Sequence, residues 1–109
     1  MSPRFESYRE FWPFYLRQHA KPATRACHYV GTMLELSTLT YALVTERWLM
    51  LLVAPVMGYG LAWLGHFAIE HNRPATFSHP FWSWISDHRM LGLFVSGRLA
   101  AELRAVGVS

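Results

Sequence analysis

The longest apolar stretch of the chain runs from Trp48 to Glu70 and reads WLMLLVAPVMGYGLAWLGHFAIE. A helix needs about 20 apolar residues to cross a bilayer, so this stretch is long enough to span one with some tilt. We therefore predict a helix over residues 48–71, which Asn72-Arg73-Pro74 ends. Its Pro and Gly residues make it irregular, a feature that transmembrane helices tolerate better than soluble ones.

Two further helices are predicted before this stretch. Aromatic residues recur at three- and four-residue spacing between positions 5 and 19, which predicts an amphipathic helix suited to a membrane interface. Pro13 is expected to kink or restart it. Lys21-Pro22 interrupts the pattern, and the next helix is predicted over 23–45, with an apolar part of about 17 residues.

A fourth helix is predicted over 80–105, because an aromatic cluster typical of a membrane interface opens a second apolar stretch there. The patterns together predict an all-α fold. It is a single membrane-embedded domain over residues 1–109, a small four-helix arrangement in which 23–45 and 48–71 form a central transmembrane hairpin. The alternative is a soluble four-helix bundle with the third helix at its centre.

Composition and charge favour the membrane interpretation. Hydrophobic residues make up 52% of the chain and charged residues 16%, against about 25% charged in an average soluble domain. The ten Lys and Arg residues are scattered, so no basic patch indicates a nucleic-acid partner, and a net charge of +3 suits anionic lipid headgroups. The single cysteine, Cys27, excludes an internal disulfide.

The placement of basic residues predicts an orientation. Five of them precede Gly31, four follow residue 72, and only Arg47 lies in the turn between the second and third helices. The positive-inside rule then places both termini in the cytoplasm and this turn on the other side. The first 30 residues show no secretory signal pattern, so we expect a multi-pass protein of a bacterial inner membrane or an endomembrane. A homo-oligomer is compatible with the sequence.

His66 and Glu70 are ionisable residues inside the apolar stretch, and such costly residues indicate a functional site. They lie about 40° apart around a helix and so share one face. In an antiparallel hairpin that end of the third helix lies beside the start of the second, which carries His28. The Pro-broken turn brings His19 to the same level. We expect these four residues to be metal ligands and catalytic residues near the cytoplasmic side.

Two or three imidazoles with one carboxylate suit non-haem iron(II) and oxygen chemistry, with zinc as the main competitor. Two other interpretations stay open. One is a haem-binding membrane protein with His28 and His66 as axial ligands. The other is a metal-free membrane scaffold without catalytic activity, in which the histidines are packed polar groups.

Several other polar residues near this site are weaker candidates. Arg25 and Arg73 flank it, and either they hold a substrate carboxylate or they are ordinary interfacial arginines. Asp87 either orients a ligand imidazole or lies exposed in a first helical turn. Solvated or orienting roles are expected for the remaining histidines. These are His71, His79 and His88.

Two long segments carry a family resemblance: FWPFYLRQHAKPATRACHYVGT and GYGLAWLGHFAIEHNRPATFSHPFWSWISD. They contain the motifs YLxxHxxPxxRxxHYxGT and GHFxxExNRPATF. With these motifs the chain resembles the short form of the iron-dependent 2-hydroxy fatty acid dioxygenase family, over roughly residues 5 to 104. Longer members of that family carry additional apolar helices.

The resemblance implies more than the residues do by themselves. Members of the family are multi-helix membrane proteins, and the eukaryotic ones reside in the endoplasmic reticulum. They shorten 2-hydroxy fatty acids by one carbon, using Fe(II) and O₂. The family's functional histidines fall on His19, His28 and His66, with Glu70 in the same motif. The resemblance thus implies an oxidoreductase of lipid metabolism, acting in fatty acid α-oxidation on a lipid or fatty-acid substrate.

Overall fold

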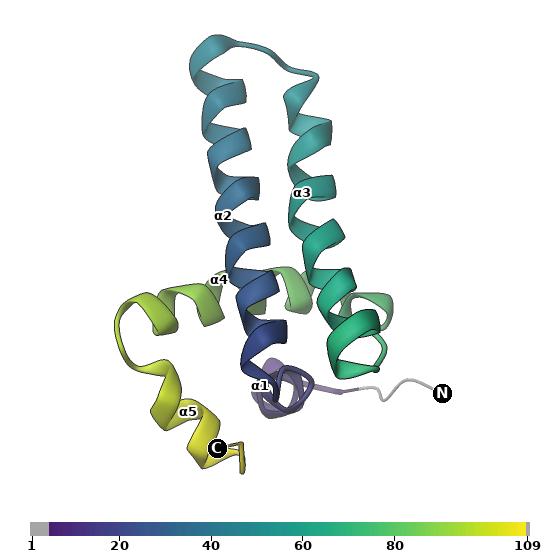
Figure 1. The fold of residues 1–109 in the computed structure, drawn as a ribbon, viewed down its shortest axis with the longest axis vertical. Helices are drawn as coiled ribbons and strands as arrows, with labels where there is room; N and C mark the ends of the chain where they lie inside the picture. Colours follow the sequence, from purple (N-terminus) through teal and green to yellow (C-terminus); the bar gives the residue numbers. More distant parts are fainter. Residues whose placement is uncertain (1–4, 109) are drawn as a thin grey trace.

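The computed structural model describes residues 5–108, and all regular structure in that part of the chain is helical. Helices α2 and α3 form an antiparallel hairpin that rises from a base built by α1, α4 and α5, with α4 crossing behind α2 (Figure 1). The elements in chain order are α1 (Tyr8–Arg17), α2 (Pro22–Thr45), α3 (Met50–Leu64), η1 (Gly65–Glu70), η2 (Ala75–Phe77), α4 (Pro80–Val95) and α5 (Leu99–Ala105).

The sequence accounts for where the first two helices begin and end. The side chain of Ser7 caps α1 by accepting a hydrogen bond from the backbone N–H of Glu10, at 3.4 Å. Helix α1 continues through Pro13 without restarting. Pro22 occupies the first turn of α2, where its missing N–H costs no hydrogen bond. Only four residues therefore separate the two helices.

The prediction of one C-terminal helix over 80–105 is wrong, because the structure has two helices there, α4 and α5. Gly97 lies between α4 and α5 with φ of 77°, a left-handed conformation that suits glycine and ends α4. Helix α5 then turns Leu99 and Leu103 into the core. Over residues 5–108 the fold is therefore all-α, as predicted, but with five α-helices and not four.

The end of the long apolar stretch also differs from an ordinary α-helix. Helix α3 ends at Leu64, and residues Gly65–Glu70 continue it as the π-helical segment η1. His71 follows with φ of 59° and ends the segment. Short π-helical segments widen a helix locally and occur frequently at functional sites.

The main hydrophobic core lies in the base and not in the hairpin. Aromatic side chains of α1 pack there against η2, α4 and α5, which fixes the level at which α1 ends. The buried members of this core are Phe11, Trp12, Tyr15, Leu16, Ala75, Met90, Leu99 and Leu103.

The two helices of the hairpin approach each other most closely at Gly31 and Gly58. A Cβ atom on Gly31 would lie 2.8 Å from the backbone oxygen of Gly58, closer than real Cβ atoms come. A Cβ atom on Gly58 would lie 2.9 Å from Oε2 of Glu35. Gly31 is therefore needed for the contact between α2 and α3, whereas a Cβ atom on Gly58 would require the Glu35 carboxylate to shift.

Replacing Gly31 by alanine is expected to destabilise the hairpin by about 2 kcal/mol, because the added methyl group meets backbone atoms that cannot move away. The matched control is Gly60→Ala, whose Cβ atom would have no neighbour within 4 Å. That variant is expected to be neutral, or stabilising by up to about 1 kcal/mol through helix propensity. Thermal unfolding in detergent checks both, and equal effects of the two substitutions would contradict the close contact.

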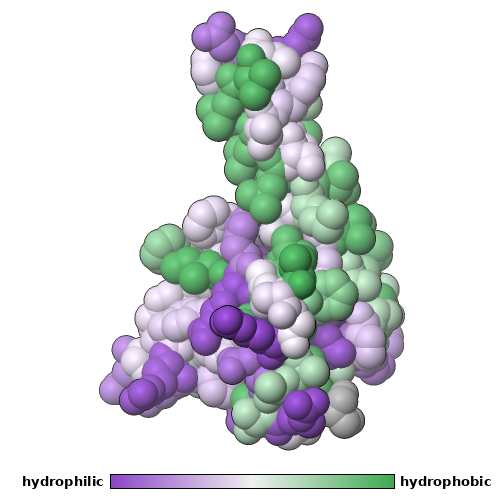
Figure 2. Space-filling model, turned by 90° about the vertical axis from the view of Figure 1, so that its left-hand side faces the viewer, coloured by the Kyte–Doolittle hydropathy of each residue, from purple (hydrophilic) through white to green (hydrophobic). Residues whose placement is uncertain are grey.

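In the described part of the chain one helical segment, Met50–Glu70, is long and apolar enough to cross a membrane. Helix α2 does not qualify, so the structure does not establish the predicted transmembrane hairpin. Figure 2 nevertheless shows apolar side chains over much of the projecting hairpin, with a hydrophilic tip. The large exposed apolar side chains of its outer half are Leu36, Tyr41, Leu43, Val44, Trp48, Leu49, Leu51, Leu52, Val56 and Met57.

Candidate metal centre

Three buried imidazoles meet where the hairpin joins the base. His19 follows α1, His28 lies in α2, and His66 lies in η1. Their Nε2 atoms are separated by 2.9 Å between His19 and His28, 3.1 Å between His28 and His66, and 3.0 Å between His19 and His66. All three residues are at least 96% buried, with exposed fractions of 0%, 4% and 1%. The predicted convergence of these histidines is therefore present in the structure.

Local structure explains how residues so far apart in the sequence reach one point. The turn between α1 and α2 is held by Arg25, whose Nη1 atom donates to the carbonyl oxygens of His19 and Ala20 at 2.7 and 2.9 Å. Asn72 holds the other side of the site, because its Nδ2 atom donates to the carbonyl oxygen of Gln18 at 3.0 Å. The end of η1 is thereby tied to the end of α1.

Each imidazole has an acceptor at its other ring nitrogen. Nδ1 of His19 lies 2.6 Å from the carbonyl oxygen of Tyr15, and Nδ1 of His28 lies 3.0 Å from Oδ1 of Asp87. Nδ1 of His66 lies 2.7 Å from Oδ1 of Asn72. Because all three partners accept hydrogen bonds, each Nδ1 carries the proton, and the Nε2 lone pairs are directed at the common centre.

Burial and neighbouring groups favour the neutral forms of His19 and Tyr15. Burial, followed by the neighbouring imidazoles of His28 and His66, lowers the pKa of His19 well below its usual value, so this ring is neutral. Burial, followed by the charge of Asp87, raises the pKa of the Tyr15 phenol well above its usual value. Tyr15 therefore stays protonated and donates a hydrogen bond to Asp87. The carboxylate of Asp87 accepts from both Tyr15 and His28.

This donor set fits a transition-metal ion. A point about 2.1 Å from each of three nitrogen atoms exists when they are about 3 Å apart, and zinc–imidazole bonds have that length. Three converging lone pairs without a cation would repel one another. The three histidines are the group of possible metal ligands that the described residues bring together. Iron(II) and zinc are both compatible with three imidazoles and open coordination positions.

Glu70 is not part of this group. Its carboxylate accepts a hydrogen bond from the backbone N–H of Lys21, and the Lys21 side chain donates to the carbonyl oxygen of Ile69 at 3.0 Å. The structure therefore places Glu70 at the N-terminus of α2, where an anion is favoured by the helix dipole. Of the four predicted ligands, the structure brings the three histidines together and places Glu70 outside their group.

The geometry also excludes the haem interpretation. Two axial ligands must lie on opposite faces of a macrocycle, whereas the Nε2 atoms of His28 and His66 are 3.1 Å apart. The Nε2 atom of His19 lies within 3.0 Å of both. No porphyrin fits between them.

The remaining candidates lie around the centre without entering it. Arg73 is exposed and its guanidinium lies over the ring of Phe77, 5.0 Å from the centroid. His71 is exposed at the end of η1. His79 stacks on Trp82 at 5.5 Å. His88 lies 2.8 Å from the buried carboxylate of Glu35, so it joins α4 to α2 two helical turns beyond His28.

Two residues that complete the site were not predicted from the sequence. Asn72 was interpreted only as part of the signal that ends the third helix, although an amide six residues after a ligand histidine can reach its ring once the helix ends. The carbonyl of Tyr15 lies one helical turn before His19, a position that any helix offers. Asp87 was correctly considered as a residue that orients a ligand imidazole.

The fold and this centre define a class of all-helical proteins with a buried three-histidine site that could hold a metal ion. A family model described as "2-hydroxy-palmitic acid dioxygenase Mpo1-like" matches residues 5–99, and the chain belongs to this Mpo1-like family. The family name implies an oxidoreductase of lipid metabolism, in agreement with the resemblance found in the sequence. No curated protein and no solved structure matched the chain.

Proposed function

We propose that the protein is an iron(II)-dependent dioxygenase that shortens 2-hydroxy fatty acids by one carbon. The observation that carries this proposal is the convergence of three buried imidazole nitrogens, from rings whose other nitrogen each faces a hydrogen-bond acceptor. Family membership supports the substrate class. The reaction balances as 2-hydroxy acid plus O₂ giving the shorter acid, carbon dioxide and water.

Different residues would hold the metal and orient its ligands at such a site. His19, His28 and His66 would hold the iron, which when bound supplies redox chemistry with O₂ and a Lewis acid for the hydroxyl and carboxylate oxygens of the substrate. Burial of the three rings excludes water from the ligand nitrogens. Asp87 and Asn72 fix the ring orientations, so that the ligand nitrogens stay aimed at one point.

The test is oxygen consumption by protein purified anaerobically in detergent and loaded with iron(II). We expect consumption with 2-hydroxyhexadecanoate, with a fatty acid one carbon shorter as product. Neither hexadecanoate nor 3-hydroxyhexadecanoate is expected to support it, because neither places a hydroxyl oxygen next to the carboxylate for joint binding. Iron-loaded protein that consumes no oxygen with any 2-hydroxy fatty acid would refute the proposal.

A membrane location accompanies this function. We propose that the hairpin enters the bilayer, with its tip on the far side and both termini in the cytoplasm. The support is threefold: one segment of spanning length, the exposed apolar side chains of the hairpin, and a single arginine at its tip. Only 22% of the most apolar window of that segment is buried inside the molecule, whereas the central helix of a soluble bundle is mostly buried.

Labelling of single cysteines tests this topology in bacterial spheroplasts. In a Cys27→Ser background, a membrane-impermeant maleimide is expected to label Arg47→Cys at the hairpin tip and to leave Ala105→Cys in the base unlabelled. Both positions are exposed in the structure, so burial does not bias the comparison. Labelling of Ala105→Cys in intact spheroplasts would contradict the orientation.

A further inference from the structure

Arg25 carries a buried positive charge without an acidic partner in the described part of the chain. Arg25 is only 9% exposed, and the partners of its guanidinium are all uncharged: Nη1 donates to the carbonyl oxygens of His19 and Ala20, and the Tyr29 hydroxyl group is a further hydrogen-bond partner. The ion pairs among the described residues are His28–Asp87, His88–Glu35 and Arg89–Glu102, and none of them includes Arg25. A buried charge is costly unless it is paired, so this guanidinium marks a place for an anion.

A pocket of about 400 Å³ adjoins Arg25, between the start of α2, the end of α4 and helix α5. Its size falls within the range of about 300–1,000 Å³ that is usual for small-molecule sites. The rings of Tyr29 and Phe94 stack along one wall, with centroids 4.3 Å apart. Apart from Arg25 and Tyr29, the lining is apolar: Pro22, Ala26, Phe94, Leu99, Ala100 and Leu103. The lining of the pocket thus combines a cationic residue with largely apolar walls.

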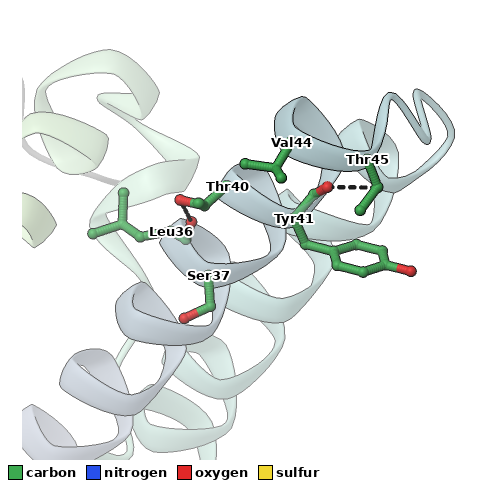
Figure 3. A pocket seen from close by; sticks show the side chains of 6 residues that line it. All are labelled: Leu36, Ser37, Thr40, Tyr41, Val44 and Thr45. Carbon is green, nitrogen blue, oxygen red and sulfur yellow. Dashed lines mark hydrogen bonds between the residues drawn. The ribbon is translucent and has the colours of Figure 1, made fainter.

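Two other hollows among residues 5–108 do not offer this combination. The one near the hairpin tip is lined by six residues of α2 alone, and Thr40 and Thr45 already bind backbone carbonyls of the same helix (Figure 3). A second, of about 280 Å³, is lined by Glu35, whose negative charge would repel a carboxylate. Charge therefore selects the pocket at Arg25 for an acidic amphiphile.

We propose that this pocket binds a long-chain carboxylic acid, with the carboxylate paired to Arg25 and the acyl chain against the apolar walls. Arg25 also binds the carbonyl of His19, so a carboxylate held there lies beside the loop that carries a ligand of the metal centre. A guanidinium pairs with a carboxylate in bidentate fashion, which would orient the head group. The identity of the acid as substrate rests on the proposed function, whereas the binding itself does not.

The experiment uses metal-free full-length protein in non-ionic detergent and [1-¹³C]hexadecanoate, followed by the carboxyl ¹³C resonance. We expect saturable binding, and hexadecan-1-ol is expected to compete at least about tenfold more weakly, because it lacks the charge that Arg25 pairs. Ala100→Trp fills the pocket and is expected to weaken binding at least about tenfold. Ala101→Trp is the matched control: it adds the same indole to the next exposed position of α5, which does not line the pocket.

Equal competition by the alcohol, equal effects of the two tryptophan variants, or no saturable binding would each overturn the inference. The ligand lacks a 2-hydroxyl group and the protein lacks metal, so failure here is separate from failure of the catalytic proposal. Oxygen consumption by the iron-loaded protein without such binding would refute the pocket alone. Binding without oxygen consumption would refute the catalytic proposal and leave the pocket in place.

Discussion

Replacing His66 by alanine is expected to remove the metal from the protein and to abolish oxygen consumption. The substitution deletes one of three nitrogen donors that lie within 3.1 Å of one another and leaves Asn72 without its imidazole partner. Loss of residues that merely orient metal ligands weakens binding by about 10–100-fold, so loss of a ligand is expected to exceed about 100-fold. Metal analysis of anaerobically purified protein measures the effect directly.

The informative control is Glu70→Gln, because sequence and structure disagree on this residue. If Glu70 is not a ligand, the variant retains wild-type metal content, since an amide oxygen can still accept the hydrogen bond from the backbone of Lys21. Helical circular dichroism of both variants verifies that they fold. Metal retained by His66→Ala would disprove the three-histidine centre, and metal lost from Glu70→Gln would return the carboxylate to the ligand set.

Helix topology was sufficient to predict that His19, His28 and His66 lie close together. An antiparallel hairpin must place the end of the third helix beside the start of the second, and the short turn at Pro22 must bring His19 to the same level. Each of these steps depends on chain connectivity and not on side-chain detail. The structure follows the prediction because α1 ends against the base core and only four residues separate it from α2.

Glu70 shows what helix topology leaves undetermined. Its helical face was predicted from the spacing to His66, but a shared face does not determine which neighbour a carboxylate binds. The unpaired N–H groups at the start of α2 lie beside it and bind its oxygen instead. The π-helical conformation of η1 likewise has no signature in the hydrophobic pattern.

The break between α4 and α5 did have a signal in the sequence. Ser96-Gly97 is a turn dipeptide, and a glycine near the end of a helical pattern often marks a left-handed C-terminal position. The apolar residues beyond it continued the helical spacing, which concealed the break. Contacts between distant segments, such as those of Asn72 with His66 and Gln18, depend on the assembled fold and could not be predicted from spacing.

Asp87→Asn is expected to weaken metal binding by about 10–100-fold without unfolding the protein. The carboxylate of Asp87 accepts hydrogen bonds from Nδ1 of His28 and from the Tyr15 hydroxyl group, and its charge makes His28 a stronger electron donor to a metal at Nε2. An asparagine has the same shape but only one uncharged acceptor oxygen, so it supports the His28 ring less well. Competition with a chelator of known affinity gives the metal dissociation constant of each variant.

Glu35→Gln provides a control of the same chemistry at the same helix contact. Glu35 of α2 pairs with His88 of α4 at 2.8 Å, as His28 of α2 pairs with Asp87 of α4 at 3.0 Å, but it touches no imidazole of the centre. If Asp87 acts by positioning His28, only Asp87→Asn weakens metal binding, whereas both substitutions lower the thermal unfolding midpoint of the metal-free protein. If both carboxylates merely hold α4 against α2, the two variants will change metal affinity by the same factor, and Asp87 has no special part in the centre.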